Sequence, residues 1–318
     1  MKTAFIYPGQ GSQTLGMGKD LYDNFAEAKA VFQEVDDALS LKLSHIIFEG
    51  EQSDLNLTAN TQPALMAVSI AVMRVLEKQS GLNLSDEAAF VAGHSLGEYS
   101  ALTAAGSFTL RDAARLLQLR GQSMQKAVPV GVGAMAAILG LDFDDVDAIA
   151  AQSATGENGE AQVCEAANDN AAGQVVISGH LAAVERAVAL ASERGAKRAV
   201  MLPVSAPFHC QLMAPAAEAM HEALDQTTIH APCVPLVANI TARNETDPAT
   251  ISSLLVEQVT GRVRWRESMG FLGENGIEHV IEIGAGKVLS GLMRRINRDI
   301  KATPIGTVAD IEAFIKTR

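Results

Sequence analysis

Apolar, strand-like runs alternate with helical patterns along most of this 318-residue chain. The strand-like runs lie at residues 3–8, 90–93, 234–239 and 279–284. Helices are expected near residues 19–39, then after the strand-like run at 90–93, and again from Lys287 onward. Because parallel strands need long crossover connections, usually helical, this alternation predicts a mostly parallel sheet covered by helices. The expected fold class is therefore α/β.

The middle of the chain follows a different order. Residues 131–203 read as strand, helix, strand, strand, helix, strand. The four strand patterns lie at 133–140, 161–167, 173–179 and 197–204, and the two helical patterns at 143–153 and 181–195. This βαββαβ order is the split-βαβ, or ferredoxin-like, pattern. We therefore expect a small ferredoxin-like subdomain at residues 129–203, inserted in a larger α/β subdomain made of residues 1–128 and 204–318.

The charge balance excludes some classes of function. The chain has 25 basic and 37 acidic residues, a formal net charge of −12, so it lacks the basic character that nucleic-acid binding needs. The first apolar run breaks at Pro8, too soon for a signal peptide. The longest stretch without a polar side chain, residues 127–141, is shorter than the roughly 18–20 residues of a membrane span. The cysteines form no CxxC pair. We expect a soluble, cytoplasmic protein with no nucleic-acid or membrane partner.

The segment GHSLG, residues 93–97, fits the pattern Gly-x-Ser-x-Gly. In that pattern a serine sits on a sharp turn between a strand and a helix, and glycines leave room for the turn. Ser95 would then lie at a helix N-terminus, where N–H groups favour a developing negative charge. The same residues also fit an ordinary N-cap serine between turn glycines. The motif makes Ser95 a candidate nucleophile.

A serine nucleophile needs a base, and His209 has the best location for one. It lies in SAPFHC, between a strand pattern and a helical pattern, in a loop stiffened by Pro203 and Pro207. Loops at strand ends are where α/β proteins usually carry function. A capping or solvent-exposed histidine is the alternative interpretation. Cys210, beside it, is better interpreted as a small buried residue than as a nucleophile.

The helix that follows Thr109 has one arginine on its apolar face. Arg120 shares the spacing 4-3-4 with Ala113, Leu117 and Met124, so its guanidinium is expected to face inward. Burying a guanidinium is costly unless it is paired. Either an internal carboxylate pairs with it, or the carboxylate of a ligand does so in a bidentate manner. The pattern alone favours neither alternative.

Two glycine-rich segments do not fit nucleotide-binding motifs. In PGQGSQ, residues 8–13, the next residue is Thr14 where the dinucleotide motif requires glycine. In GAGKVLSG, residues 284–291, Val288 follows Lys287 where a P-loop requires Ser or Thr. PGQGSQ is better interpreted as a loop whose backbone N–H groups can approach an anion. The sequence has no metal-binding motif, and we expect neither a metal nor a bound cofactor.

Taken together, these motifs resemble the malonyl-CoA:acyl carrier protein transacylases of fatty acid synthesis, a family that also includes acyltransferase domains of polyketide synthases. The resemblance covers the whole chain. In order along it stand PGQGSQ, GHSLGEYSAL, Arg120, NDNAAGQVVISG, PVSAPFH, NIT and EIGAGKVLSGLMRRI. It implies an α/β-hydrolase-like large subdomain and a ferredoxin-like small one. Ala172 and Ala285 stand where the family often has proline, which affects only the rigidity of two turns.

The resemblance implies a role for each matching residue. Ser95 matches the nucleophile, His209 its base, and Arg120 the residue that binds the malonyl carboxylate. Gln10 and Leu96 match the residues whose backbone N–H groups form the oxyanion hole. The remaining matches are a pocket glutamine near the histidine, two asparagines of the acyl or pantetheine channel, and an aromatic residue that weakly favours malonyl: Gln258, Asn168, Asn170 and Phe208. In this family a main-chain carbonyl usually orients the histidine where a triad would use aspartate.

The resemblance also implies a reaction and its partners. Family members move a malonyl group from malonyl-CoA to the phosphopantetheine thiol of acyl carrier protein through a malonyl-serine, so the substrates supply the thiols. Such carrier proteins are acidic, so we expect the enzyme to bind them through basic residues. We also expect the enzyme to be a monomer. The candidate docking residues are Arg262, Arg264, Arg266, Lys287, Arg294 and Arg295, although a solvated helix face explains them equally well.

Three other functions fit parts of the pattern. A serine esterase or thioesterase on a related scaffold would share Ser95 and His209, but Arg120 argues against it. A polyketide-pathway acyltransferase would share all three residues. A non-catalytic subunit that binds carrier protein would have no need of this combination of residues.

Overall fold

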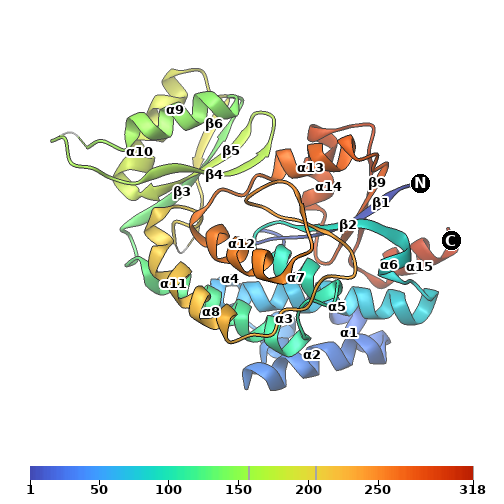
Figure 1. Cartoon of the computed structure of the whole chain (residues 1–318). Coiled ribbons are helices and arrows are strands. Elements are labelled where there is room, and N and C mark those ends of the chain that lie inside the picture. The colour runs from blue at the N-terminus through green and yellow to red at the C-terminus, as the bar shows by residue number, and fades with distance from the viewer. Residues whose placement is uncertain (157, 205, 318) are drawn as a thin grey trace.

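Two separate β-sheets organise the chain (Figure 1). The structure, a computed structural model, describes residues 1–156, 158–204 and 206–317. Its larger sheet has the strand order β10-β9-β1-β2-β7-β8, and all neighbouring pairs are parallel except the antiparallel pair β7–β8. The strands are β1 (Thr3–Tyr7), β2 (Ala88–Gly93), β7 (Leu236–Val237), β8 (Asn244–Glu245), β9 (His279–Ile283) and β10 (Lys301–Ile305). The predicted α/β fold class with a mostly parallel sheet is confirmed.

Helices cover both faces of this sheet, which is why its central strands are apolar on both sides. Along β1, Phe5 and Tyr7 pack into the core beneath the sheet in the view of Figure 1, whereas Ala4 and Ile6 pack into the core above it. The helices below include α2 (Ala26–Leu39), α5 (Thr58–Ser80), α7 (Gly97–Ala104) and α8 (Leu110–Ala127). Above lie α13 (Trp265–Glu274) and α14 (Val288–Ile296), which enclose the buried indole of Trp265.

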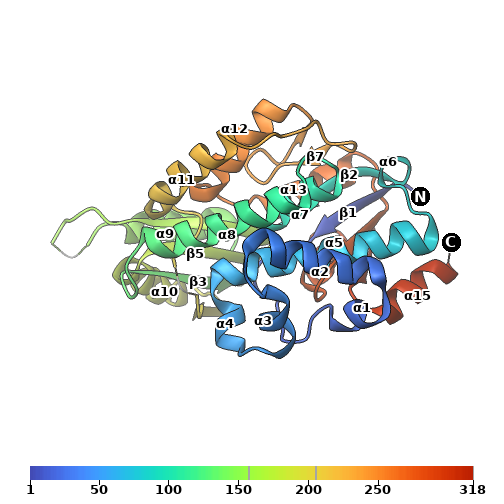
Figure 2. The same cartoon turned by 90° about the horizontal axis from the view of Figure 1, so that it is seen from below.

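Eight further helical elements complete the large subdomain within the described residues. Figure 2 shows α3 and α4 beside α2, and α15 near both termini. These helices are α1 (Lys19–Asn24), α3 (Leu43–Glu49), α4 (Gln52–Asn56), α6 (Leu84–Glu87), α11 (Ala214–Asp225), α12 (Pro248–Thr260), α15 (Val308–Lys316) and the 3₁₀ turn η1 (Gln211–Met213). None of the helices in the described ranges combines the length and apolar composition that crossing a membrane requires.

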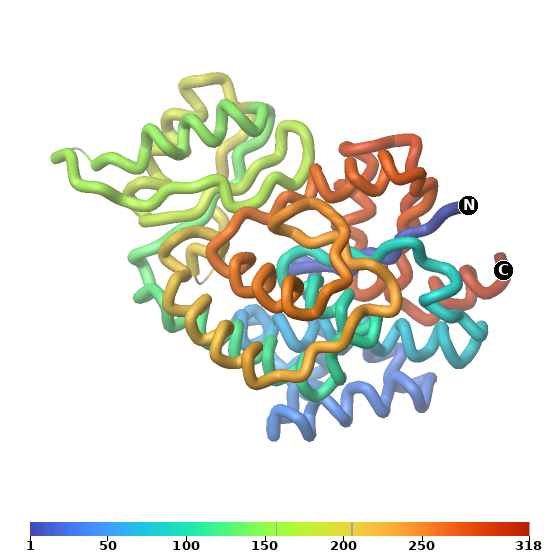
Figure 3. Tube along the Cα trace, in the orientation of Figure 1, coloured from blue at the N-terminus to red at the C-terminus, as the bar shows by residue number. Residues whose placement is uncertain are grey.

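The smaller sheet is antiparallel, with the order β4-β5-β3-β6. It contains β3 (Gly133–Leu139), β4 (Cys164–Ala171), β5 (Gln174–His180) and β6 (Arg198–Met201), with α9 (Phe143–Ser153) and α10 (Leu181–Glu193) on one face. Figure 3 shows the trace of these residues leaving the large subdomain and returning to it. The predicted ferredoxin-like order is confirmed, while the boundaries at residues 129 and 203 stay a prediction.

Several elements differ from their predicted bounds, and the strand expected at 197–204 spans only Arg198–Met201. The helix expected at 19–39 is two helices, because Phe25 has an extended backbone (φ −129°, ψ 124°) that ends one and begins the next. The strand expected at 161–167 starts at Cys164 and runs on to Ala171, so the asparagines of NDNAA lie on a strand. The strand expected at 234–239 is paired only at Leu236–Val237, after a proline that has no N–H to donate.

Candidate active site

The turn between β2 and α7 carries Ser95. Its backbone is left-handed, with φ +54°, which is rare for a residue with a side chain and typical of a sharp strand-to-helix turn. A Cβ on Gly93 would lie 1.9 Å from the carbonyl carbon of Gly97, so only glycine fits there. Asn239 holds the turn from outside: its Oδ1 accepts from the N–H of Ser95 at 2.8 Å and its Nδ2 donates to the carbonyl of Gly93 at 2.7 Å. The local sequence thus presents the serine hydroxyl at the start of α7.

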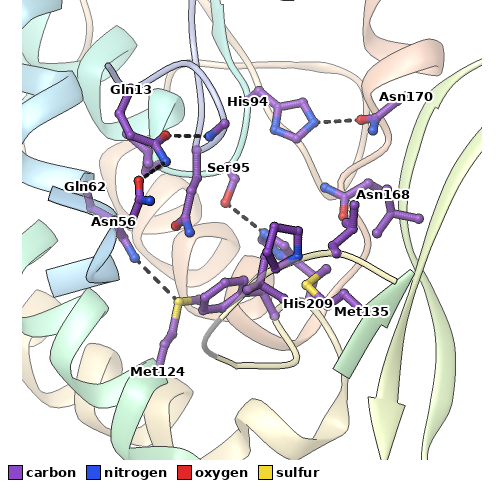
Figure 4. Close-up of a pocket in the computed structure, with 18 of the residues that line it drawn as sticks. Gln13, Asn56, Gln62, His94, Ser95, Met124, Met135, Asn168, Asn170 and His209 are labelled. Atoms are coloured by element: carbon purple, nitrogen blue, oxygen red, sulfur yellow. Dashed lines mark hydrogen bonds between the residues drawn. The ribbon is translucent and has the colours of Figure 1, made fainter. Parts of the chain in front are cut away.

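Ser95 and His209 form a hydrogen-bonded pair. Ser95 Oγ lies 2.7 Å from His209 Nε2, as the dashed line in Figure 4 marks. On the other side of the ring, Nδ1 lies 2.8 Å from the carbonyl oxygen of Gln258 and 3.1 Å from that of Gly261. A carbonyl oxygen can only accept, so Nδ1 carries the proton and Nε2 is left to accept from the hydroxyl. Main-chain carbonyls therefore orient this histidine, in the position where a triad has aspartate.

The ionisation state of His209 suits a base. Burial, followed by the nearby charge of Arg120, lowers the pKa of His209 to about 3. Both effects disfavour the imidazolium, so the ring is neutral at ordinary pH. A neutral imidazole with a free acceptor at Nε2 can take a proton from a serine that attacks a carbonyl carbon.

Arg120 is buried beside this pair, with 1% of its surface exposed. Its Nη1 donates to Gln62 Oε1 at 2.7 Å, and its Nη2 donates to Gln258 Oε1 at 2.8 Å and to Ser95 Oγ at 3.3 Å. Within the described ranges no carboxylate oxygen lies within 4 Å of the guanidinium nitrogens. The sequence leaves two alternatives open, an internal carboxylate or the carboxylate of a ligand. The described residues place no carboxylate in direct contact with Arg120, which excludes the first. Neutral amide oxygens hold the guanidinium in place, and among the described residues no opposite charge contacts it.

A cavity of about 410 Å³ opens between the two sheets above these groups. Figure 4 shows Ser95 and His209 facing Asn168 and Met135, which belong to the small subdomain. The candidate residues that line the cavity are Ser95, His209, Arg120, Gln10, Leu96, Asn168, Asn170 and Phe208. Gln258 is fully buried behind them and contacts both the histidine and the arginine. The structure thus brings the predicted site residues together around one cavity.

Two backbone donors at the edge of the cavity are unused. Neither the N–H of Gln10 nor that of Leu96 has a hydrogen-bond acceptor within the part of the chain that the structure describes. Gln10 is fixed through its side chain, whose Oε1 accepts from Thr58 Oγ1 at 2.9 Å. Leu96 directly precedes α7, where backbone N–H groups point out of the helix. Such donors can receive the oxygen of a substrate carbonyl.

Four residues that hold the site together were not predicted from the sequence. Gln62, on the buried helix α5, binds Arg120, and no local pattern marks it. Asn239 and Glu98 lie in two of the family motifs, NIT and GHSLGEYSAL, and these motifs could have indicated both residues. His94, next to Ser95, places its Nε2 2.8 Å from Asn170 Oδ1 (Figure 4), and burial lowers its pKa. Among the described residues no group of His, Cys, Asp or Glu side chains could hold a metal ion.

The six basic docking candidates fall into two sets. In the first, Arg264 pairs with Glu267, Arg266 Nη2 lies 2.8 Å from the buried carboxylate of Asp169, and Arg262 lies over the ring of Phe143. These arginines are partly buried and already have partners. The second set is exposed: Lys287 lies at the start of α14, and Arg294 and Arg295 lie in its last turn, where Arg295 Nη1 donates to Gln174 Oε1 at 2.9 Å. None of the six lines the cavity.

Comparison with known proteins gives a consistent result. Residues 4–309 match the acyl transferase domain family. The malonyl CoA-acyl carrier protein transacylase of Bacillus subtilis (strain 168) is 46% identical over 316 residues, which cover 99% of this chain and 97% of that protein. The crystal structure of an acyl-carrier-protein-S-malonyltransferase from Bartonella henselae has a TM-score of 0.95 at 60% identity, covering 100% and 99% of the two chains. A malonyl-transacylase in complex with a type II polyketide acyl-carrier protein has a TM-score of 0.94 at 40% identity, covering 100% of both. The chain belongs to the acyl transferase family, among the malonyl CoA-acyl carrier protein transacylases.

Proposed function

We propose that this enzyme transfers a malonyl group from malonyl-CoA to the phosphopantetheine thiol of acyl carrier protein, through a malonyl ester of Ser95, and so supplies fatty acid biosynthesis. The observation that carries this proposal is the buried guanidinium of Arg120, whose Nη2 lies 3.3 Å from the nucleophile's oxygen. A fixed cation without an anionic partner, beside a serine nucleophile, suits an acyl group that ends in a carboxylate. The names of the relatives support the same substrate and acceptor.

In the first half-reaction, Ser95 Oγ attacks the thioester carbonyl of malonyl-CoA while His209 Nε2 takes the hydroxyl proton. The carbonyl oxygen becomes an oxyanion that accepts from the N–H groups of Gln10 and Leu96. Each such donor contributes roughly 3–4 kcal/mol in comparable sites. As the tetrahedral intermediate collapses, the C–S bond breaks and the proton on His209 passes to the CoA sulfur.

In the second half-reaction, the phosphopantetheine thiol of the carrier protein attacks the malonyl ester. His209 takes the thiol proton and then returns it to Ser95 Oγ as the ester bond breaks. The two thiols use the same site in turn, which gives ping-pong kinetics. Asn168, Asn170 and Phe208 line the route that both pantetheine arms would share. One chain supplies every group in this scheme, so we propose a monomer, and its free cysteines fit the reducing cytoplasm.

Intact-mass measurement tests this function directly. Incubation with malonyl-CoA alone is expected to add the mass of one malonyl group to the protein, and carrier protein is expected to remove it and to gain the same mass. Acetyl-CoA should label the enzyme far less, because its acyl group leaves Arg120 without a partner. Release of free malonate faster than transfer to carrier protein would favour a thioesterase, and preference for methylmalonyl-CoA would favour a polyketide-pathway enzyme.

The exposed basic set on α14 is the proposed docking surface for the acidic carrier protein. Reversing the charge of Lys287, Arg294 and Arg295 together to glutamate should raise the KM for carrier protein about tenfold or more. The reason is that electrostatic attraction between the partners becomes repulsion, an effect that should shrink at high salt. Stopped-flow or intact-mass loading with malonyl-CoA should be unchanged, because none of the three lines the cavity.

The matched control reverses three exposed lysines on other helices, Lys29, Lys78 and Lys126, which gives the same change in net charge. This control should leave the KM for carrier protein within about twofold of the unmodified enzyme. Equal effects of the two triple variants would mean that net charge, and not the α14 surface, governs the encounter.

A further inference from the structure

A carboxyl group that the proposed mechanism does not use lies under the active site. Glu98 is in the first turn of α7, three residues after the nucleophile, and 1% of its surface is exposed. Its Oε2 accepts from Gln258 Nε2 at 2.5 Å and from the backbone N–H of Asn239 at 3.4 Å. A buried carboxyl costs free energy and so calls for an explanation.

Gln258 connects this carboxyl to Arg120. The Nε2 of its amide faces Glu98 and also the carbonyl of Ser95 at 3.0 Å, while its Oε1 accepts from Arg120 Nη2 at 2.8 Å. The reverse orientation would place the amide oxygen against acceptors and the amide N–H against the guanidinium, so one orientation is fixed. A carboxyl and a guanidinium, neither in direct contact with an opposite charge, are thus joined by a single amide.

Apart from Arg120, the buried titratable groups around Glu98 are neutral. The elements packed against α7 are β1, β2, α5 and α8, and their buried titratable groups are Tyr7 on β1 and Arg120 on α8. Tyr99 follows Glu98 directly. Burial raises the pKa of both tyrosines and lowers the pKa of His94 and His209. Glu98 and Arg120 are therefore the groups in this cluster that can carry charge at ordinary pH.

A malonyl carboxylate on Arg120 would add a second anion to a buried cluster with one cation. Two anions sharing one cation in a low-dielectric site repel each other strongly, and the usual response is that one takes up a proton. The malonyl carboxylate, in direct contact with the guanidinium, keeps its charge more easily than Glu98, which reaches Arg120 only through an amide.

We propose that ionised Glu98 and a bound acyl carboxylate exclude each other as anionic partners of Arg120, so that malonyl binding holds Glu98 protonated. The inference rests on the proposed function, because it takes Arg120 as the binding group for the acyl carboxylate. The proton comes from solvent, and no bond of the ligand is broken. Glu98 is then a positioning residue: when ionised in the empty pocket it balances the charge of Arg120 through Gln258, and it touches no substrate atom.

The pH dependence follows from this exclusion. Burial, opposed by the hydrogen bonds from Gln258 and Asn239 and by Arg120, raises the pKa of Glu98 to about 8. Below that pH Glu98 is already protonated and malonyl binding takes up few protons. Above it Glu98 is ionised in the empty pocket, and malonyl binding, which raises its pKa further, must be accompanied by uptake of a proton. The affinity for malonyl-CoA should therefore fall as pH rises through about 8, by at most tenfold per pH unit.

Binding calorimetry on the full-length Ser95→Ala variant, which cannot be acylated at this position, tests the proposal. Malonyl-CoA is titrated at several pH values between about 6.5 and 9.5, each in two buffers with different enthalpies of ionisation, which gives the number of protons taken up. That number should be near zero at the acid end and rise toward one through about pH 8. Acetyl-CoA controls for the CoA phosphates and should show no such rise.

A second variant tests whether Glu98 is the group that takes up the proton. Adding Glu98→Gln, which keeps the shape and an acceptor oxygen but cannot ionise in this range, should abolish the rise and make the affinity for malonyl-CoA independent of pH. Uptake that persists in this double variant would overturn the proposal and point to His209 or His94. If the double variant does not fold, the comparison of malonyl-CoA with acetyl-CoA decides alone, and tight malonyl-CoA binding without proton uptake overturns the proposal. Malonyl-CoA that binds no better than acetyl-CoA would instead overturn the proposed role of Arg120, and with it the proposed function.

Discussion

Replacing Ser95 with alanine is expected to abolish the malonyl-enzyme and to reduce transfer to carrier protein at least about a thousandfold. Replacing His209 with alanine should cost nearly as much, because the serine hydroxyl, 2.7 Å from Nε2, then has no base. Groups that act as one unit are not additive, so the double variant should be no slower than the worse of the two single variants. Intact mass after incubation with malonyl-CoA and initial rates of transfer measure both effects.

The control for this experiment is Cys210→Ala, next to the histidine in sequence. The Cys210 side chain is buried, and its Sγ donates to the carbonyl of Pro207 at 3.2 Å, while burial raises the pKa of the thiol to about 11. The substitution should therefore leave transfer within about tenfold of the unmodified enzyme. Loss of the malonyl adduct in Cys210→Ala, with the adduct kept in Ser95→Ala, would show that Cys210 and not Ser95 is the nucleophile.

The second large effect concerns substrate choice. Replacing Arg120 with alanine should lower kcat/KM for malonyl-CoA by the cost of breaking a buried charge pair, about 3–5 kcal/mol, or roughly two to four orders of magnitude. The rate with acetyl-CoA should change far less, because an acetyl group has no carboxylate to lose. The ratio of the two kcat/KM values, measured with the same enzyme preparation, is the quantity that matters.

Arg111→Ala is the matched control, since it removes an exposed arginine from the same helix. It should change neither substrate's kcat/KM by more than about twofold. Arg120→Ala leaves a cavity and frees Gln62 and Gln258 from their contacts, so thermal unfolding should be recorded for every variant. Equal losses for malonyl-CoA and acetyl-CoA in a folded Arg120→Ala enzyme would contradict the role of this arginine as the carboxylate-binding group.

Features with local causes were predictable from sequence. The turn at Ser95 follows from two glycines that bracket a serine between a strand and a helix, and the inward direction of Arg120 follows from helical periodicity alone. The order of elements in the small subdomain followed from the switch between strand and helix periods. In each case residues within about one turn or one strand determine the result.

Features that depend on tertiary packing were not predictable. Gln62 lies on a helix whose middle is buried on every side, so no amphipathic pattern distinguishes the one residue that binds Arg120. Gln258 orients His209 through its main-chain carbonyl, a group that every residue possesses, so only the family resemblance and no local pattern indicated it. The partner of Arg266 on α13 is Asp169 on β4 of the smaller sheet, and only the folded chain brings the two together.

The two walls of the cavity have separate origins. The proposed reacting and anchoring groups all belong to the large subdomain, whereas Met135 on β3 and Val176 on β5 reach the cavity from the small one; these groups are Ser95, His209, Arg120 and Gln258. Side chains on the inserted sheet therefore shape the cavity without supplying any of these four groups. The fold thus places part of the wall of the acyl chamber on a separate subdomain, so substitutions on the insert can change the room for the acyl group while Arg120 still selects for its charge.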